Sequence, residues 1–322
     1  MIQERSNFGR SLEIAVLCGG VSAERDVSFH SGAAVGGALR RRGHRVKTIK
    51  VSDRRVADLD SFEGDAAFIA LHGCFGEDGG IQRILERRGI AYTGSDPVAS
   101  RLAMDKAASK ETFQLAGIPT PSWTIVPPHM SVRDAIRHVG EATGLPAVLK
   151  PLRGGSSIGV EIARSREELA RRLEGQRDES LLVEEYLPGR ELTVSILGEE
   201  ALPIVELRPA RPFFDYEAKY TDAGTEYGNA ASLGPTVYRR VQEIGLAAHG
   251  ALGCRAFSRV DLILPEKGEP TVLEVNTIPG LSEKSLLTQA AGMVGIDFGD
   301  LCETMISLAL PAMDETTERR QP

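Results

Sequence analysis

The chain has 322 residues, and 42% hydrophobic with 26% charged residues is ordinary for a globular protein of two or three domains. Its formal charge of −7 gives no support for a nucleic-acid or acidic-membrane partner. The four cysteines are widely spaced, which favours a reduced chain over a disulfide framework or zinc site. With no membrane-length apolar run and no signal-peptide pattern, the sequence predicts a cytoplasmic location without membrane insertion.

The N-terminal part of the sequence predicts a doubly wound α/β unit. An apolar run at residues 12–18 ends in two glycines, and a helix-like pattern continues to residue 42. Further strands are expected at residues 45–51 and 66–71, and a helix at residues 80–88. The turn GGVSAE does not match GxGxxG, so a nicotinamide-dependent dehydrogenase is weakly supported.

Two residues of this unit fall at carboxyl ends of predicted strands, where ligands bind in such folds. Glu24 is one of them, although a glutamate in a first helical turn is also explained by the helix dipole. His72 is the other, and the glycines around it in LHGCFGEDGG permit close backbone approach to a ligand. A plain turn explains that segment as well, so both interpretations stay open.

The middle of the chain contains a glycine and serine loop beside a lysine. Two helical stretches at residues 95–117 precede IPTPS, a rigid connection at residues 118–122 that is a candidate domain boundary. After a predicted helix at residues 132–143, a strand reaches Lys150 and the loop RGGSSIG follows. Backbone N–H groups and hydroxyls of such a loop can surround phosphate oxygens, and the lysine adds charge. The Walker pattern GxxxxGK[ST] is absent, and a flexible hairpin tip is the alternative.

The second half of the chain alternates predicted strands, a long loop and helices. Strands are expected at residues 181–187, and at 192–197 and 201–207 as an antiparallel hairpin. Residues 215–231 show no clean period and predict a long loop of the kind that often forms a lid. Helices are expected at residues 237–252, 284–293 and 298–310, before a polar tail.

Residues 259–285 predict a hairpin with a polar face. Arg259 and Asp261 share one face of the first strand, and Glu274 and Asn276 share a face of the second. Two carboxylates and an amide oxygen suit Mg²⁺ that is shared with substrate phosphates. The guanidinium would stabilise negative charge beside the metal. A solvated hairpin face with ordinary surface charges is the alternative.

The sequence contains, in order and across nearly its whole length, the motifs LCGGVSAERDVS, LHGCFGEDGG, YTGS, MDK, VLKPLRGGSSIGV, EEYLPGRELTVSILGEE, DYEAKY, GCRAFSRVDLIL and LEVNTIPGLSEKSL. This series resembles the D-alanine–D-alanine ligases of the ATP-grasp superfamily. The resemblance implies an ATP-grasp fold of α/β and α+β class with a doubly wound N-terminal domain. It implies domains at residues 1–104, 105–188 and 189–322, the last with the lid, the metal site and a disordered tail.

The resemblance also implies residue roles. Glu24, Ser156 and Tyr220 would form a hydrogen-bonded set at the ammonium of the first D-alanine, with His72 nearby. Arg259 and the Gly280 backbone would stabilise the oxyanion, and Ser285 and Leu286 would receive the second D-alanine. ATP would contact Lys106, Lys150, Ser157, Glu184, Glu185, Leu187, Glu191 and Lys219. Asp261, Glu274 and Asn276 would ligate two Mg²⁺ or Mn²⁺ ions.

The implied reaction joins two D-alanines through an acyl phosphate, with ADP and phosphate released, for peptidoglycan precursor synthesis in a homodimeric enzyme. Tyr220 favours D-alanine as the second substrate. Departures from the family pattern occur at Gly228-Asn229, at Ile278 and in the loop 282–285. Another ATP-grasp carboxylate–amine ligase, or a non-catalytic nucleotide-binding protein on the same scaffold, are the alternatives.

Overall fold

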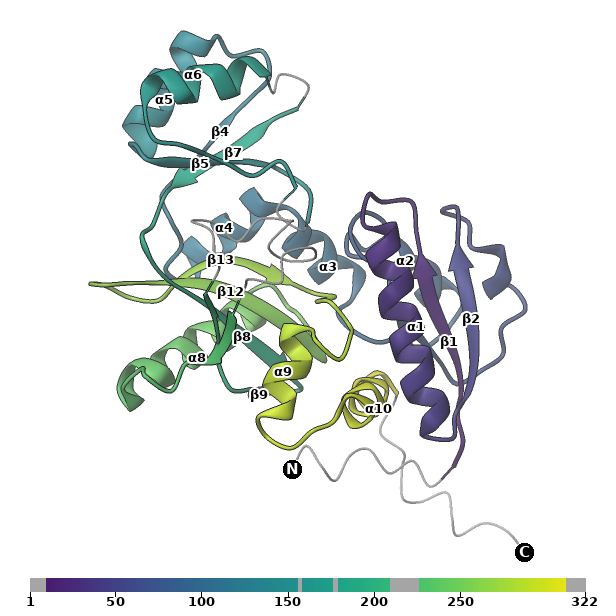
Figure 1. The fold of residues 1–322 in the computed structure, drawn as a ribbon. Helices are drawn as coiled ribbons and strands as arrows, with labels where there is room; N and C mark the ends of the chain where they lie inside the picture. The colour runs from purple at the N-terminus through teal and green to yellow at the C-terminus, as the bar shows by residue number, and fades with distance from the viewer. Residues whose placement is uncertain (1–9, 156–157, 176–178, 209–225, 311–322) are drawn as a thin grey trace, which may run out of the picture.

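The computed structural model describes residues 10–155, 158–175, 179–208 and 226–310, and in these ranges it forms three β-sheets (Figure 1). Ser156, Ser157, Lys219 and Tyr220, most of the expected lid and nearly all of the tail lie outside the described residues. Within those ranges, no helix combines the length and the apolar character that a membrane span needs.

The N-terminal sheet is parallel, as the strand–glycine–helix pattern predicts. It has the order β2-β1-β3, and α1 follows the glycine turn after β1. Fully buried strands such as β3 are typical of parallel sheets, whose two faces are both covered. The elements are β1 (Glu13–Gly19), α1 (Arg25–Arg41), β2 (Arg45–Val51), β3 (Ala66–Ile69) and α2 (Gly80–Arg87).

The second sheet is antiparallel, with the order β4-β7-β5-β6, and with α5 and α6 it forms the upper lobe in Figure 1. The sequence pattern did not predict β4 or α6. The helix α6, REELARRLEG, is polar and buries only Leu169 and Leu173, so its apolar stripe is too narrow to stand out. The elements are α3 (Pro97–Met104), α4 (Lys106–Leu115), β4 (Trp123–Val126), α5 (Val132–Ala142), β5 (Ala147–Pro151), β6 (Glu161–Ala163), α6 (Arg166–Gly175) and β7 (Leu181–Glu185).

The third sheet has the order β11-β10-β8-β12-β13, with β9 beside β8. Two expectations are wrong here. The strand expected at 201–207 is divided, because Pro203 lacks the N–H that a continuous ladder needs. Residues 226–229, expected in a loop, form β11 against β10. The elements are β8 (Gly189–Leu197), β9 (Glu200–Ala201), β10 (Val205–Arg208), β11 (Glu226–Asn229), α8 (Pro235–Ala251), β12 (Phe257–Pro265) and β13 (Thr271–Asn276).

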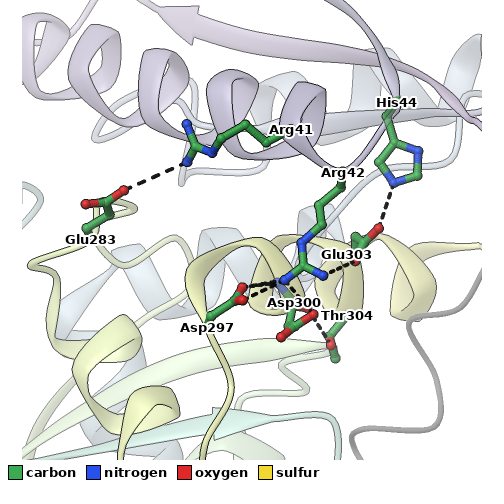
Figure 2. A network of polar contacts seen from close by, with 8 residues as sticks. All are labelled: Arg41, Arg42, His44, Glu283, Asp297, Asp300, Glu303 and Thr304. Atoms are coloured by element: carbon green, nitrogen blue, oxygen red, sulfur yellow. Dashed lines mark hydrogen bonds and ion pairs between the residues drawn. The ribbon is translucent and has the colours of Figure 1, made fainter.

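The last helices, α9 (Leu286–Gly292) and α10 (Phe298–Ala309), belong to the hydrophobic core cluster of the N-terminal sheet, where α10 packs against α1 and β3 and α9 packs against β8 and β10 of the third sheet. Polar contacts reinforce this packing (Figure 2). Arg42 donates to both oxygens of Asp297 at 2.6 and 2.7 Å, and His44 Nε2 lies 3.1 Å from Glu303 Oε1. The expected boundaries at 104/105 and 188/189 fall between sheets, and we propose them as domain limits, with α9 and α10 completing the N-terminal core.

Candidate active site

The hairpin of β12 and β13 gathers the polar face that the sequence predicts. Arg259 pairs with Asn276 and Asp261 with Glu274, before the register shifts between Asp261 and Leu262. Arg259 donates to both Asp261 oxygens, Nε at 2.8 Å and Nη2 at 2.7 Å, and Asn276 Nδ2 donates to Oδ2 at 3.1 Å. The carboxylates and the guanidinium therefore form one connected polar surface and not a row of separate solvated charges.

Two lysines of the central sheet region face this hairpin. Lys106, the first residue of α4, donates to the carbonyl of Gly154 at 2.7 Å, and its Nζ lies 3.5 Å from Glu274 Oε2. Lys150, on β5, forms an ion pair with Glu184 of β7. The glycine loop and the acidic hairpin thus lie close enough for one lysine to contact both.

A cavity of about 360 Å³ lies between the second and third sheets. Its lining combines both charge types with an apolar part that suits a planar ring. Nine residues with expected site roles line it: Lys106, Lys150, Glu184, Glu185, Leu187, Glu191, Asp261, Glu274 and Leu286. The structure thus places the two lysines and the acidic hairpin around one cavity.

The buried charges at the cavity wall compensate one another. Burial disfavours the charged form of Lys150, but Glu184, Glu274 and Glu191 outweigh that effect and raise its pKa. Burial would likewise raise the pKa of Glu184, yet Lys150 and Lys110 hold it below its ordinary value. Lys110 was not among the predicted site residues, although it follows Lys106 by four positions and therefore shares its helix face.

Glu24 lies where the N-terminal domain meets the glycine loop. It is buried at the N-terminus of α1, and its backbone N–H donates to Ser22 Oγ at 3.2 Å. A β-carbon on Gly155 would lie 2.9 Å from Glu24 Oε2, and one on Gly73 would clash with the same oxygen. Glycine at both positions lets two backbone segments approach the carboxylate closely.

Glu77 is a second buried carboxylate in this region, and it was not among the predicted site residues. It accepts a hydrogen bond from the Gly73 N–H at 2.8 Å and lines a small pocket with Lys106, Glu274 and Asn276. Burial and the nearby Glu24 raise the pKa of Glu77 to about 8. The sequence feature that could have identified Glu77 is its position in the segment LHGCFGEDGG, which was already a candidate for contact with a ligand.

His72 connects the N-terminal domain to the segment after β13. Its Nδ1 lies 3.1 Å from the carbonyl of Ile278 and its Nε2 lies 2.8 Å from Ser31 Oγ. Since a carbonyl only accepts, Nδ1 carries the proton and Nε2 accepts from the serine hydroxyl. Burial lowers the pKa of His72 to about 4, so the ring is neutral at physiological pH.

The expected second-substrate residues meet at the start of α9. Ser285 is the N-cap residue, and its hydroxyl accepts from the Ser282 N–H at 2.9 Å. A β-carbon on Gly280 would lie 3.2 Å from Ser285 Oγ, so the two positions are neighbours. Leu286 lines the main cavity, which brings this helix terminus to the site.

The donor set fits Mg²⁺ bound jointly with a substrate. In the described part of the chain, no three His, Cys, Asp or Glu side chains gather as a self-sufficient metal site. Asp261 and Glu274, which pair across the hairpin, and the amide of Asn276 offer only part of an octahedral oxygen shell. Such partial sets are typical of Mg²⁺ that keeps waters and substrate phosphates as its other ligands.

The chain is similar to known proteins over most of its length. A family model described as D-ala D-ala ligase C-terminus matches residues 112–307. The chain is 44% identical to the D-alanine--D-alanine ligase of Citrifermentans bemidjiense, with 92% of this chain and 96% of that protein covered. It is also similar to a crystal structure of the D-alanine--D-alanine ligase from Bacillus anthracis (TM-score 0.83, 36% identity) and to one of that ligase complexed with ATP (TM-score 0.81, 35% identity). Each comparison covers 93% of this chain and 97% of the other.

Proposed function

The chain belongs to the D-alanine–D-alanine ligase family, and we propose that its main cavity joins two D-alanines at the expense of ATP, for peptidoglycan precursor synthesis. One observation carries this proposal. A single cavity is lined by Lys106 and Lys150 on one side and by Asp261 and Glu274 on the other. A nucleoside triphosphate with its metal ion requires this charge distribution, with cations for the phosphates and carboxylates for the metal.

The nucleotide would lie between the second and third sheets. Lys106 and Lys150 would contact its phosphates, and Glu184, Glu185 and Leu187 at the end of β7 would frame the adenine. Glu191 would reach the ribose. ATP supplies the phosphoryl group that activates a D-alanine carboxylate. Ser157 and Lys219, expected to contribute further phosphate contacts, lie outside the described residues and stay predictions.

Asp261, Glu274 and Asn276 would hold Mg²⁺ or Mn²⁺ through their side-chain oxygens. The ion supplies charge neutralisation between the two carboxylates and the phosphates. Arg259 pairs with Asp261, and Lys106 Nζ lies 3.5 Å from Glu274 Oε2. Two ions in the site, as the resemblance implies, remain a prediction.

The first D-alanine would lie on the N-terminal side of the cavity. Its ammonium group would bind Glu24, whose carboxylate lies next to Gly155 of the phosphate loop. Neutral His72 would hold the segment around Gly73 in place through its bonds to Ser31 and Ile278. Ser156 and Tyr220, expected to complete this set, lie outside the described residues.

The second D-alanine would lie at the start of α9. Ser285 and Leu286 would receive its carboxylate, because a helix N-terminus favours an anion. Its amine attacks the activated carbonyl, and negative charge develops on the carbonyl oxygen. Arg259 and the Gly280 backbone would stabilise that charge.

Phosphate release from purified protein tests the proposal. ATP and Mg²⁺ are supplied with D-alanine alone, L-alanine alone or D-serine alone, or with D-lactate together with D-alanine. The products are identified by mass spectrometry. D-alanine alone should give equal amounts of phosphate and D-alanyl-D-alanine. Phosphate release that is insensitive to D-alanine would reject the proposal, and turnover with a different amino-acid pair would favour another carboxylate–amine ligase.

We also propose a cytoplasmic, homodimeric enzyme. All four cysteines lie in the described residues and are free thiols, which supports a reducing compartment. Light scattering on the purified protein would measure the oligomeric state.

A further inference from the structure

A buried charge cluster lies behind the cavity wall, and one of its members does not reach the cavity. Lys110 on α4 is 1% exposed in its side chain and Glu184 on β7 is 2% exposed. Lys110 Nζ lies 2.8 Å from Glu184 Oε2, and Glu184 Oε1 forms an ion pair with Lys150. Among the described residues that line the main cavity, Lys150 and Glu184 occur but Lys110 does not.

Lys110 also connects the cluster to the acidic hairpin. Its Nζ donates to Thr120 Oγ1 at 2.9 Å, and the Thr120 hydroxyl donates to the carbonyl of Val272 at 2.9 Å. Val272 lies on β13, two residues before Glu274. The side chain of Lys110 therefore joins the strand that carries Glu184 to the strand that carries a proposed metal ligand.

We propose that Lys110 is a positioning residue for the nucleotide, which acts by holding the Glu184 carboxylate so that Lys150 faces the cavity. This inference rests on the proposed nucleotide site. Glu184 has one oxygen toward each lysine, so Lys110 occupies the oxygen that Lys150 does not use. When the phosphates attract Lys150, Lys110 still provides a partner for the buried carboxylate, which would otherwise lose its compensation.

The alternative is that Lys110 only stabilises the fold, as many buried ion pairs do. The two roles predict different results when the cation is removed. In Lys110→Met, Glu184 keeps only Lys150 as a partner and draws its ammonium away from the nucleotide. Positioning therefore predicts weaker nucleotide binding beyond any loss of stability, whereas a structural role predicts a stability loss alone.

Calorimetric titration with ADP and Mg²⁺, at a temperature well below the unfolding midpoint, measures this effect without catalysis. Lys110→Met should raise the Kd for ADP at least about 10-fold, and Lys110→Arg, which keeps donors and charge, should stay within about threefold of wild type. At saturating ATP, the KM for D-alanine should change less than about twofold in both variants. Val139→Ala is the matched control, because Val139 is buried in the core of the second sheet, which carries Lys150 and Glu184, and lines neither pocket of the site.

Different results would contradict the nucleotide site and the role of Lys110. Wild-type protein that does not bind ADP with Mg²⁺ contradicts the proposed nucleotide site itself. If wild type binds ADP and Lys110→Met has the same Kd, the proposed role of Lys110 is wrong. It is also wrong if Lys110→Met loses no more affinity for ADP than a Val139→Ala protein of similar stability.

A second comparison covers the case in which Lys110→Met does not fold. Glu184→Gln and the double variant Lys110→Met/Glu184→Gln both lack the buried carboxylate that Lys110 is proposed to hold. Their Kd values for ADP should agree within about twofold. A much higher Kd for ADP in the double variant than in Glu184→Gln would overturn the proposal, because Lys110 would then affect nucleotide binding independently of the Glu184 carboxylate.

Discussion

Arg259, which we propose to stabilise the oxyanion, forms a bidentate pair with Asp261 in the structure. This fork geometry is specific to arginine, since a lysine ammonium offers a single point charge. The pair also fixes the orientation of the Asp261 carboxylate, which would help to hold the metal. Arg259 thus has two roles that a lysine could fill only in part.

Arg259→Lys should therefore lower kcat about 10²-fold or more through loss of oxyanion stabilisation, while the KM for ATP changes little. Steady-state phosphate release with D-alanine measures both parameters. Arg240→Lys is the matched control, because Arg240 is an exposed arginine that pairs with Glu269 far from the cavity lining. Similar kcat values for the two variants would contradict the role of Arg259.

His72 makes stability depend on pH in a defined direction. Its pKa is lowered from 6.5 to about 4, so the folded protein prefers the neutral ring. Burial of the neutral ring therefore makes a pH-dependent contribution of roughly 3 kcal/mol to the free energy of unfolding. This contribution is complete above pH 6.5 and is lost as the pH falls toward 4. His72→Gln, which is always neutral, should lose less unfolding free energy than wild type between pH 7 and pH 4.

Urea unfolding at several pH values measures this difference. Other titrating groups, including Glu77 and His249, are present in both proteins, so their effects largely cancel in the comparison. If the free energy of unfolding changes with pH in the same way in wild type and in His72→Gln, the ring is not held neutral by burial.

Among the elements, α1 and α10 join parts of the chain that are far apart in sequence (Figure 2). Arg42 follows α1 and contacts Asp297 and Asp300 at the start of α10, while Glu303 lies one turn further on. Acidic residues at this helix terminus are also favoured by the helix dipole. The network positions α10 against α1 and the N-terminal sheet.

Arg42→Met should therefore destabilise the protein by about 1–3 kcal/mol, because several carboxylates lose a shared partner. The turnover number at 25 °C should stay within about twofold, since Arg42 does not line the main cavity. Thermal unfolding and phosphate release give the two readouts. Arg45→Met, at an exposed arginine 3.4 Å from Glu13, is the control, and an equal loss of stability in both would contradict the role of the network.

The sequence predicted those elements whose apolar pattern is strong. The strands β1 and β2 were located within one residue, and the predicted hairpin at residues 259–285 contains β13 and most of β12, with four polar side chains correctly placed on one face. The strand β11 was missed, because Gly228 and Asn229 have low strand propensity and only the pairing with β10 fixes them. Glu77 and Lys110 were missed for a related reason, since their importance comes from burial beside charges on other elements.

At the scale of the molecule, the site depends on how three sheets are placed. The main cavity lies between the second and third sheets, and Glu24 and His72 reach the same region from the N-terminal domain. Different parts of the fold thus supply different parts of this region: α4 and β5 supply lysines, the hairpin of β12 and β13 supplies Asp261 and Glu274, and the start of α1 supplies Glu24. A ligand that contacts several of these parts must favour the folded, assembled state.

ADP with Mg²⁺ should consequently raise the unfolding midpoint, with a stabilisation of about 2.7 kcal/mol when the ligand is at 100 times its Kd. Lys150→Met should lose most of this increase, whereas Lys47→Met, at an exposed lysine on β2, should retain it. Differential scanning calorimetry measures the shift. An equal shift in wild type and Lys150→Met would mean that the nucleotide binds elsewhere.

The central claim is that the cavity activates the carboxylate of one D-alanine by transfer of the ATP γ-phosphoryl group before the second D-alanine attacks. Incubation of the protein with ATP, Mg²⁺ and D-alanine labelled with ¹⁸O in its carboxylate tests this directly. One ¹⁸O atom should appear in the released phosphate for each dipeptide formed. Dipeptide formation with unlabelled phosphate, or with AMP as the nucleotide product, would contradict the account.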